Sequence, residues 1–199
     1  AQRRVLVHAH DVPVPAWPAG APPLRVAFGS DFHAGPTTHP RLLELACQRL
    51  AETEPDVVLL GGDFVYLCAS FVDDLAEGLG RVPAPFGRYA VLGNHDLWAD
   101  DLYVQRKLEA AGIHVLTNRS MRLAAPFDHV SVCGIDEAWV GDPDEAGAFA
   151  DATERRILLT HSPSGLLYAK EQPFDLALCG HTHGGHIALP GGKPIYLPH

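Results

Sequence analysis

Residues 57–63 of the sequence read VVLLGGD, a short apolar run joined directly to two glycines and an aspartate. A run of four aliphatic residues bounded by glycine predicts a strand that is buried on both faces. The same arrangement, a buried strand followed by a polar loop, recurs at four other places, with apolar runs at residues 24–28, 89–92, 157–160 and 176–179. Each predicted strand therefore delivers polar side chains at its carboxyl end.

Segments with helical spacing of apolar residues lie between these strands. Leu42, Leu45 and Ala46 share one face of a helix predicted over residues 41–53. A second helix is predicted over residues 103–111, and Gly112 follows it where a C-capping glycine belongs. Strands that alternate with helices predict an α/β domain, whose ligands bind at the carboxyl ends of the strands. The further predicted elements are helices at residues 71–79 and 144–155 and strands at 115–116 and 130–135.

The length of 199 residues predicts a single domain over residues 1–199. Residues 1–23 hold five prolines and form a rigid approach, in which the alternation of Val5 and Val7 predicts an edge strand. No apolar run approaches the 20 residues that a membrane span requires. Since the chain starts at Ala1, the prior removal of a targeting segment stays open.

The composition of the chain indicates which partners and which redox compartment it fits. The formal net charge of -9 disfavours nucleic acid, because duplex binding relies on clustered Lys and Arg. The four cysteines show no Cys-x-x-Cys spacing, and each lies in or beside an apolar stretch. We therefore expect buried free thiols and a reducing compartment. The cysteines are Cys47, Cys68, Cys133 and Cys179.

The polar residues that follow the predicted strands are of types that bind metals. If these loops converge, they bring carboxylates, an amide and several imidazoles close together. Such a cluster costs free energy unless bound cations compensate the charges and lone pairs. Mixed oxygen and nitrogen donors suit Mn, Fe, Zn, Co or Ni, and the absence of thiolates argues for a site with open positions. Asp63 is the candidate bridge between two ions, because one carboxylate can hold two cations about 3.5 to 4 Å apart.

Five ordered motifs carry a resemblance to the calcineurin-like metallophosphoesterases. They span residues 24–186, and Gly-His-Thr-His at residues 180–183 is the most specific of them. The resemblance implies a four-layer αββα sandwich, with two mixed β-sheets flanked by helices. The other motifs are Ser-Asp-Phe-His at 30–33, Gly-Gly-Asp at 61–63, Gly-Asn-His-Asp at 93–96 and His-Ser-Pro at 161–163.

The resemblance also implies roles for individual residues. It implies a metal-dependent phosphoric ester hydrolase in which a metal-bridging hydroxide attacks phosphorus, with diesters favoured over monoesters. His95 would be the general acid and Asp96 would orient it, unless Asp96 only caps the following helix. The implied ligands are Asp31, His33, Asp63 and His183 for one ion, and Asp63, Asn94, His161 and His181 for the other.

Four further residues have two interpretations each. Tyr66 is favoured as pocket wall over metal ligand, because His33 already fills the position that a tyrosine takes in purple acid phosphatases. His186 is either a substrate contact or an exposed loop residue. Trp98 and Trp139 are either pocket aromatics or packing residues.

The extended signature GHTHGGH at residues 180–186 resembles a bacterial, membrane-associated subgroup that includes phosphodiesterases of lipid-linked nucleotides. The resemblance implies a phosphate-ester substrate, such as a nucleotide-linked lipid, and a cytoplasmic or peripheral membrane location. Members of the subgroup continue beyond the point where this chain stops, so we expect an incomplete C-terminal end. The alternatives are a nuclease of the same superfamily and an inactive metal-binding scaffold. Substrate, metal identity and oligomeric state are left open.

Overall fold

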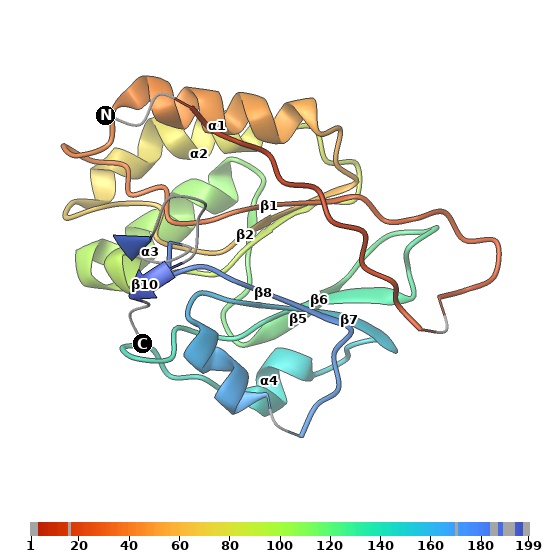
Figure 1. The fold of residues 1–199 in the computed structure, drawn as a ribbon. Helices are drawn as coiled ribbons and strands as arrows, with labels where there is room; N and C mark the ends of the chain where they lie inside the picture. Colours follow the sequence, from red (N-terminus) through yellow and green to blue (C-terminus); the bar gives the residue numbers. More distant parts are fainter. Residues whose placement is uncertain (1–3, 16, 170, 184–186, 189–193, 197–199) are drawn as a thin grey trace.

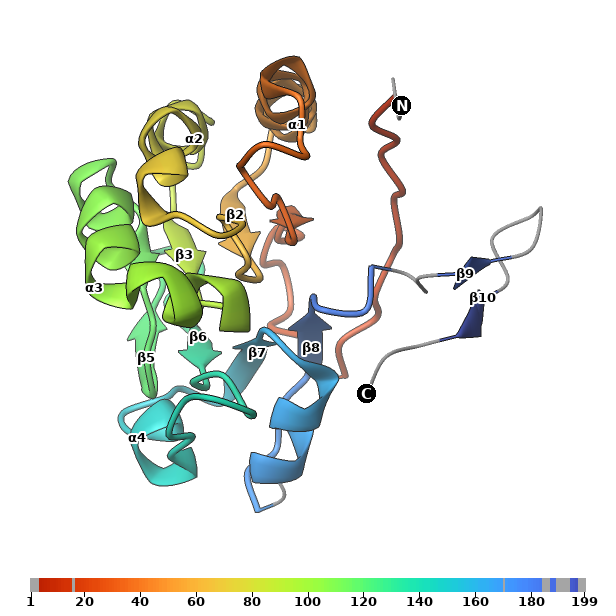
Figure 2. The same cartoon turned by 90° about the vertical axis from the view of Figure 1, so that its left-hand side faces the viewer.

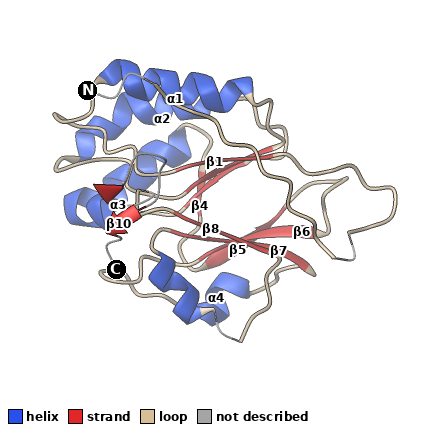
Figure 3. Cartoon of the chain, viewed as in Figure 1, coloured by secondary structure: helices blue, strands red, loops and turns tan. Residues whose placement is uncertain are grey.

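The computed structural model describes residues 4–15, 17–169, 171–183, 187–188 and 194–196. Two four-stranded sheets lie face to face, and helices cover the outer face of each (Figures 1 and 3). The predicted α/β sandwich of two sheets flanked by helices is therefore confirmed. Mixed pairing is found in the second sheet, while the described pairs of the first sheet are all parallel.

The first sheet has the order β1-β2-β3-β4, and its strands are joined by crossover helices on the outer face (Figure 1). Its strands are β1 (Val26–Gly29), β2 (Val57–Leu60), β3 (Arg88–Ala90) and β4 (His114–Val115). The helices are α1 (Pro40–Glu52), the 3-10 helix η1 (Ala69–Phe71), α2 (Val72–Gly80) and α3 (Asn94–Ala110).

The second sheet has the order β5-β6-β7-β8, in which β5 runs antiparallel to β6 and the other pairs are parallel. A separate antiparallel pair is formed by β9 and β10. The strands are β5 (Arg119–Arg122), β6 (Val130–Gly134), β7 (Arg155–Thr160), β8 (Leu176–Cys179), β9 (Ile187–Ala188) and β10 (Pro194–Tyr196). The helices on this side are α4 (Glu145–Phe149) and the 3-10 helix η2 (Pro163–Tyr168).

The central strands are apolar on both faces because each face has its own core. On β2, Val57 and Leu59 pack between the sheets, whereas Val58 and Leu60 pack against the helices. This alternation is the period of two that a strand imposes on its side chains. On β7, Leu159 likewise belongs to the central core, while Leu158 packs on the outer side of the sheet with residues of α4. Three apolar layers thus hold the four structural layers together.

The carboxyl ends of the parallel strands from both sheets meet at one edge of the sandwich, the side that faces the viewer in Figure 2. Hydrogen bonds cross between the two sheets there. The backbone N–H of His181, after β8, donates to the carboxylate of Asp31, after β1, at 3.0 Å. The ring of His161, after β7, bonds the carbonyl oxygen of Gly61, after β2, at 2.7 Å. The predicted convergence of these loops is therefore present.

Several elements differ from the sequence expectations. The predicted edge strand at Val5 and Val7 is wrong: residues 4–12 form no helix or strand, and Leu6 is 71% exposed. The helix predicted over residues 103–111 begins nine residues earlier, at Asn94, and is broken at Asp100 (φ −179°, ψ 92°). The helix predicted over residues 144–155 ends at Phe149, because Ala150 turns to an extended conformation (ψ 133°) and Asp151 to a left-handed one (φ 58°).

One strand is absent from the sequence expectations, and three cysteines are less buried than expected. β5 has no apolar run, since its sequence is RSMR and none of its residues is fully buried. It forms by pairing with β6, a contact that local sequence does not encode. All four cysteines are free as predicted, but only Cys133 is buried: Cys47 and Cys179 are partly exposed, and Cys68 is exposed. It precedes η1, with its Sγ 3.2 Å from the hydroxyl of Ser70.

Candidate metal centre

The predicted metal ligands lie on an unusual backbone. Positive φ angles are uncommon outside glycine, because the Cβ atom crowds the carbonyl oxygen. Nine other residues of the described chain have them, and five of the nine are predicted ligands. Such strain clusters at functional sites, where the surroundings hold it in place. The five are Asp31 (55°), His33 (45°), Asp63 (54°), His181 (68°) and His183 (52°).

Asp63 lies at the middle of the cluster and is 2% exposed. Its Oδ2 is 3.5 Å from Nε2 of His33 on one side and 3.4 Å from Nε2 of His161 on the other. Its Oδ1 accepts the backbone N–H of His95 at 2.9 Å. Burial raises the pKa of Asp63, but the hydrogen bond and charge of His161 outweigh burial, so the net pKa is lowered. The carboxylate is therefore held as an anion between two sets of nitrogen donors.

The first set of donors consists of Asp31, His33 and His183, whose donor atoms lie within 4.8 Å of one another. Nε2 of His183 is 3.3 Å from Oδ1 of Asp31 and 3.2 Å from Nε2 of His33. Ser30 donates its hydroxyl to the other oxygen of Asp31 at 2.6 Å. Two imidazole nitrogens at 3.2 Å need a proton or a cation between them, so this set fits a metal ion.

The second set consists of Asp63, His161 and His181, with Asn94 beside them. Nδ1 of His181 lies 3.1 Å from Oδ1 of Asn94 and 3.2 Å from Nε2 of His161. The carbonyl oxygen of Gly61 can only accept, so the Nδ1 of His161 that contacts it carries the proton. The lone pair of a neutral His161 is therefore on Nε2, which faces the other donors. A hydrogen bond from the ring nitrogen that does not face the metal to a backbone carbonyl is typical of a metal-binding histidine.

The charge of Asp63 acts strongly on His161. Burial lowers the pKa of this imidazole, yet the hydrogen bond and charge of Asp63 overcome burial and raise the pKa to about 9. The pKa of His33 is lowered instead, by burial above all. Nδ1 of His33 is buried without a hydrogen-bond partner among the described residues. The carboxylates and imidazoles thus interact strongly, and a cation between them would bind the unprotonated forms.

His95 stands in the first turn of α3, beside both sets. Its ring lies 4.8 Å from that of His33, 5.1 Å from that of Tyr66 and 5.1 Å from that of Trp98. Its donor atom also groups with those of His33 and Asp63. Tyr66 contacts the rings of His33 and His95 at the edge of the cluster, which agrees with its interpretation as pocket wall.

Asp96 has a different place from His95. It is completely buried, and its Oδ1 accepts the backbone N–H groups of Phe64 at 2.8 Å and Val65 at 3.1 Å. Its Oδ2 accepts the N–H of Gly93 at 2.9 Å. No contact of its carboxylate with the His95 ring is recorded among the described residues. The structure therefore gives Asp96 the capping role that the sequence left open, and this carboxylate also anchors the loop after Asp63.

Two glycines allow the loops to approach each other closely. A Cβ on Gly93 would lie 2.2 Å from Oδ1 of Asp63, and one on Gly62 would lie 2.6 Å from the backbone nitrogen of Gly93. Gly62 also has a φ of 88°, which side-chain-bearing residues rarely adopt. Any larger residue at position 93 would displace the central carboxylate.

Two residues in the turn after β6 lie near the metal donors, although the sequence does not assign them to the site. The ring of Trp139 is 49% exposed and lies edge-on, 4.7 Å from the ring of His181. Glu137, two residues earlier, is fully buried and was not predicted. The signal for it was available, because it follows the predicted strand at 130–135 as the other polar residues follow theirs. His186 lies outside the described residues.

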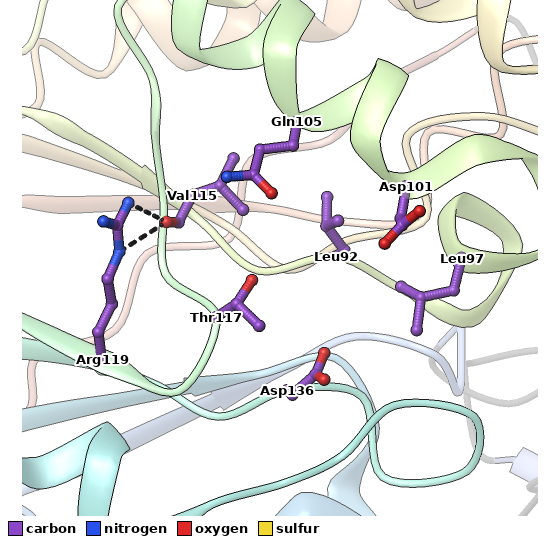
Figure 4. A pocket seen from close by; sticks show the side chains of 8 residues that line it. All are labelled: Leu92, Leu97, Asp101, Gln105, Val115, Thr117, Arg119 and Asp136. Atoms are coloured by element: carbon purple, nitrogen blue, oxygen red, sulfur yellow. Dashed lines mark hydrogen bonds between the residues drawn. The ribbon is translucent and has the colours of Figure 1, made fainter.

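A cavity of about 250 Å³ lies near this edge, between α3 and the segment from β4 to β5 (Figure 4). It includes none of the predicted ligands. Arg119 fills one side and donates from Nε to the carbonyl oxygen of Val115 at 3.0 Å. The lining residues are Leu92, Leu97, Asp101, Gln105, Val115, Thr117, Arg119 and Asp136. The metal donors thus form a separate cluster.

An α/β sandwich of two sheets that gathers carboxylate and imidazole donors at its strand ends has the architecture of a metallophosphoesterase. The structure is similar to NAD nucleotidase (NadN) of Haemophilus influenzae, with a TM-score of 0.56 and 16% sequence identity. The match covers 80% of this chain and 38% of that protein, and it shows the fold alone.

The sequence comparisons identify the family. The family model for calcineurin-like phosphoesterases matches residues 24–185, and this chain belongs to that family. Phosphodiesterase YaeI of Escherichia coli is 32% identical over 88% of this chain and 66% of its own length. Metallophosphoesterase YkuE of Bacillus subtilis is 30% identical over 91% of this chain and 65% of its own length. A transmembrane protein with a metallophosphoesterase domain from Danio rerio is 31% identical over 89% of this chain and 44% of its own length. The chain thus spans about two thirds of the first two relatives.

Proposed function

We propose that this chain hydrolyses a phosphodiester with the help of two transition metal ions, of Mn, Fe, Zn, Co or Ni. The observation that carries the proposal is the position of Asp63, whose carboxylate belongs to two separate groups of donor atoms, one with His33 and His95 and one with His161 and His181. A shared carboxylate between two nitrogen-rich sets is the arrangement that a pair of closely spaced cations requires.

Each ion has a donor set in this proposal. Asp31, His33, Asp63 and His183 would hold one ion, and Asp63, Asn94, His161 and His181 would hold the other. When bound, the ions supply positive charge for the phosphoryl oxygens and lower the pKa of water enough for attack at neutral pH. The protein orients its donors through contacts behind them, such as the bond from Nδ1 of His161 to Gly61.

His95 is the proposed proton donor to the leaving oxygen. The N–H of its backbone is tied to Asp63 and its ring lies beside that of His33, so its position relative to the ions would be fixed. The ring is half-buried and lies edge-on to the exposed ring of Trp98. General acids of this kind typically contribute a factor of about 10² to 10⁴ in rate.

The substrate class is also part of the proposal. The name of the Escherichia coli relative supports a diester over a monoester. A substrate at a membrane, such as a nucleotide-linked lipid, and a peripheral location of this domain belong to the same proposal; the Danio rerio relative is named as a transmembrane protein. Among the described residues, no helix has the length and apolar character to cross a membrane.

The test combines metal analysis with hydrolysis. We expect two metal ions per chain by elemental analysis and faster cleavage of bis(p-nitrophenyl) phosphate than of p-nitrophenyl phosphate. Asp63→Asn should abolish hydrolysis and weaken both ions, because it removes the shared charge. His95→Asn should lower kcat by at least tenfold with both ions retained.

The matched control for His95 is His114→Asn, which changes an exposed histidine on β4 that packs on Tyr89. It should leave metal content and kcat unchanged. Wild-type protein that binds no metal, or full activity in both Asp63→Asn and His95→Asn, would refute the proposal.

A further inference from the structure

One buried carboxylate beside the metal centre has no part in the proposed mechanism. Glu137 follows β6 and is 0% exposed. Its Oε2 accepts the backbone N–H groups of Trp139 at 2.7 Å and Val140 at 2.9 Å. Its Oε1 is buried and has no hydrogen-bond partner among the described residues. Because a buried charged oxygen without a partner costs free energy, such an atom needs an explanation.

The turn that carries Glu137 has a fixed shape. Asp136 accepts the N–H of Glu137 at 2.8 Å through one oxygen and the N–H of Asp142 at 2.9 Å through the other. A Cβ on Gly141 would lie 2.6 Å from the carbonyl oxygen of Glu137, so the chain closes tightly on itself. The turn places the ring of Trp139 edge-on against His181, with an angle of 76° between the planes.

His181 presents one particular nitrogen to the other donors. Nδ1 is the atom near Asn94 and His161, at 3.1 and 3.2 Å. A neutral imidazole that offers its lone pair at Nδ1 carries its proton on Nε2, at the other side of the ring. Burial lowers the pKa of His181 most, and the carboxylate of Glu137 is among the charges that oppose this effect. Trp139, whose N–H is bonded to Glu137, contacts the ring of His181, so the turn that carries the buried carboxylate packs against this ring.

We propose that Glu137 is a positioning residue for the second metal ion: its Oε1 accepts the Nε2–H of His181 through one bridging water, and so holds Nδ1 toward Asn94 and His161. Metal-binding histidines almost always give their other N–H to a carboxylate, a carbonyl or water. A hydrogen bond through one water is nearly as favourable as a direct one. The inference rests on the proposed function, because it assigns His181 to a metal ion.

The decisive variant is Glu137→Gln. Glutamine keeps the shape of the side chain and an oxygen for the amides of Trp139 and Val140, but it removes the charge and offers an NH2 group in place of Oε1. Metal-free protein is titrated with Co²⁺, with calorimetry for affinity and visible absorption for coordination geometry. We expect one of the two sites to bind at least tenfold more weakly, with an altered spectrum, and the other to stay within twofold of wild type.

Asp136→Asn is the matched control, since it weakens the same turn without removing Glu137. It should bind both ions with wild-type affinity. In a His181→Asn background, Glu137→Gln should cause no further loss of Co²⁺ affinity, because the two residues act through one contact.

Unchanged affinities and spectra in Glu137→Gln would overturn the inference and leave the proposed function intact. An equal loss in Asp136→Asn, or an additive loss in the double variant, would overturn it too, since the shape of the turn would then be responsible. If Glu137→Gln does not fold, Glu137→Asp replaces it: the shorter side chain withdraws the carboxylate from His181, so the same weakening of one site is expected and wild-type affinity would overturn the inference. A wild-type chain that binds no Co²⁺ would overturn the proposed function as well.

Discussion

Asp96→Ala should destabilise this protein far more than the loss of an ordinary helix cap. The substitution leaves the backbone N–H groups of Phe64, Val65 and Gly93 without the carboxylate that accepts them. All three amides belong to buried residues. Each buried donor left without an acceptor costs about 1–3 kcal/mol, so the smallest value for each gives a loss of about 3 kcal/mol in the free energy of unfolding. That loss is a large part of the 5–15 kcal/mol typical of a folded domain, taken as a rough scale.

Urea unfolding followed by circular dichroism measures the effect. With a slope of about 2 kcal/mol per M, a loss of about 3 kcal/mol lowers the midpoint by about 1.5 M. The control is Asp100→Ala, at the break within α3, where the carboxylate accepts the N–H of Tyr103 at 2.9 Å in an exposed position. An exposed cap of this kind is worth about 1 kcal/mol, so its midpoint should fall by about 0.5 M.

Equal midpoints for the two variants would refute the assignment of Asp96 as a buried cap. Asp96→Asn separates capping from catalysis. Asparagine keeps one acceptor oxygen for Phe64 and Val65, so we expect this variant to fold and to retain most of its turnover. A fall in kcat as large as that of His95→Asn, with unchanged stability, would instead support the original interpretation that Asp96 orients His95.

Two further predictions concern the centre itself. Gly93→Ala should weaken both metal sites by at least tenfold in a Co²⁺ titration, because its Cβ would lie 2.2 Å from Oδ1 of Asp63. Gly112→Ala, where a Cβ meets nothing within 4 Å, should lower only stability, and equal metal loss in both would contradict this. His161, with a pKa of about 9, holds a proton at pH 7 that a metal ion must displace. Affinity should therefore rise about tenfold per pH unit toward pH 9 and level off above it, and a pH-independent affinity by calorimetry would contradict this.

The sequence predicts the central strands well because each of them is a continuous apolar run in the local sequence. β2 and β8 begin and end where their apolar runs do, at Val57–Leu60 and Leu176–Cys179. Parallel strands bring their carboxyl ends to one edge, so the position of each polar loop followed from the strand before it. The structure accordingly brings all seven predicted ligands together, from loops as distant in sequence as those of Asp31 and His181.

The features that were missed depend on contacts that cross the fold. β5 exists because β6 offers it hydrogen bonds, and its own sequence carries no apolar run. The sequence pattern places the first turn of α3 outside the helix, because the Asp96 carboxylate that stabilises this turn is fixed by amides 31 and 32 residues away. Glu137 follows its predicted strand as the ligands follow theirs, but its burial depends on the turn over residues 136–142, which no apolar pattern predicts.

The left-handed backbone of the ligand loops has a consequence for protein engineering. Five of the seven predicted ligands occupy a conformation that isolated peptides avoid, and neighbouring loops and glycines hold them in it. Transplanting the seven side chains onto another scaffold of similar shape would not reproduce their directions, because a helix or strand position aims its Cβ elsewhere. A graft would have to carry the strand-to-loop segments as whole units, together with Gly62, Gly93 and the buried carboxylate of Asp96 that anchors two of them.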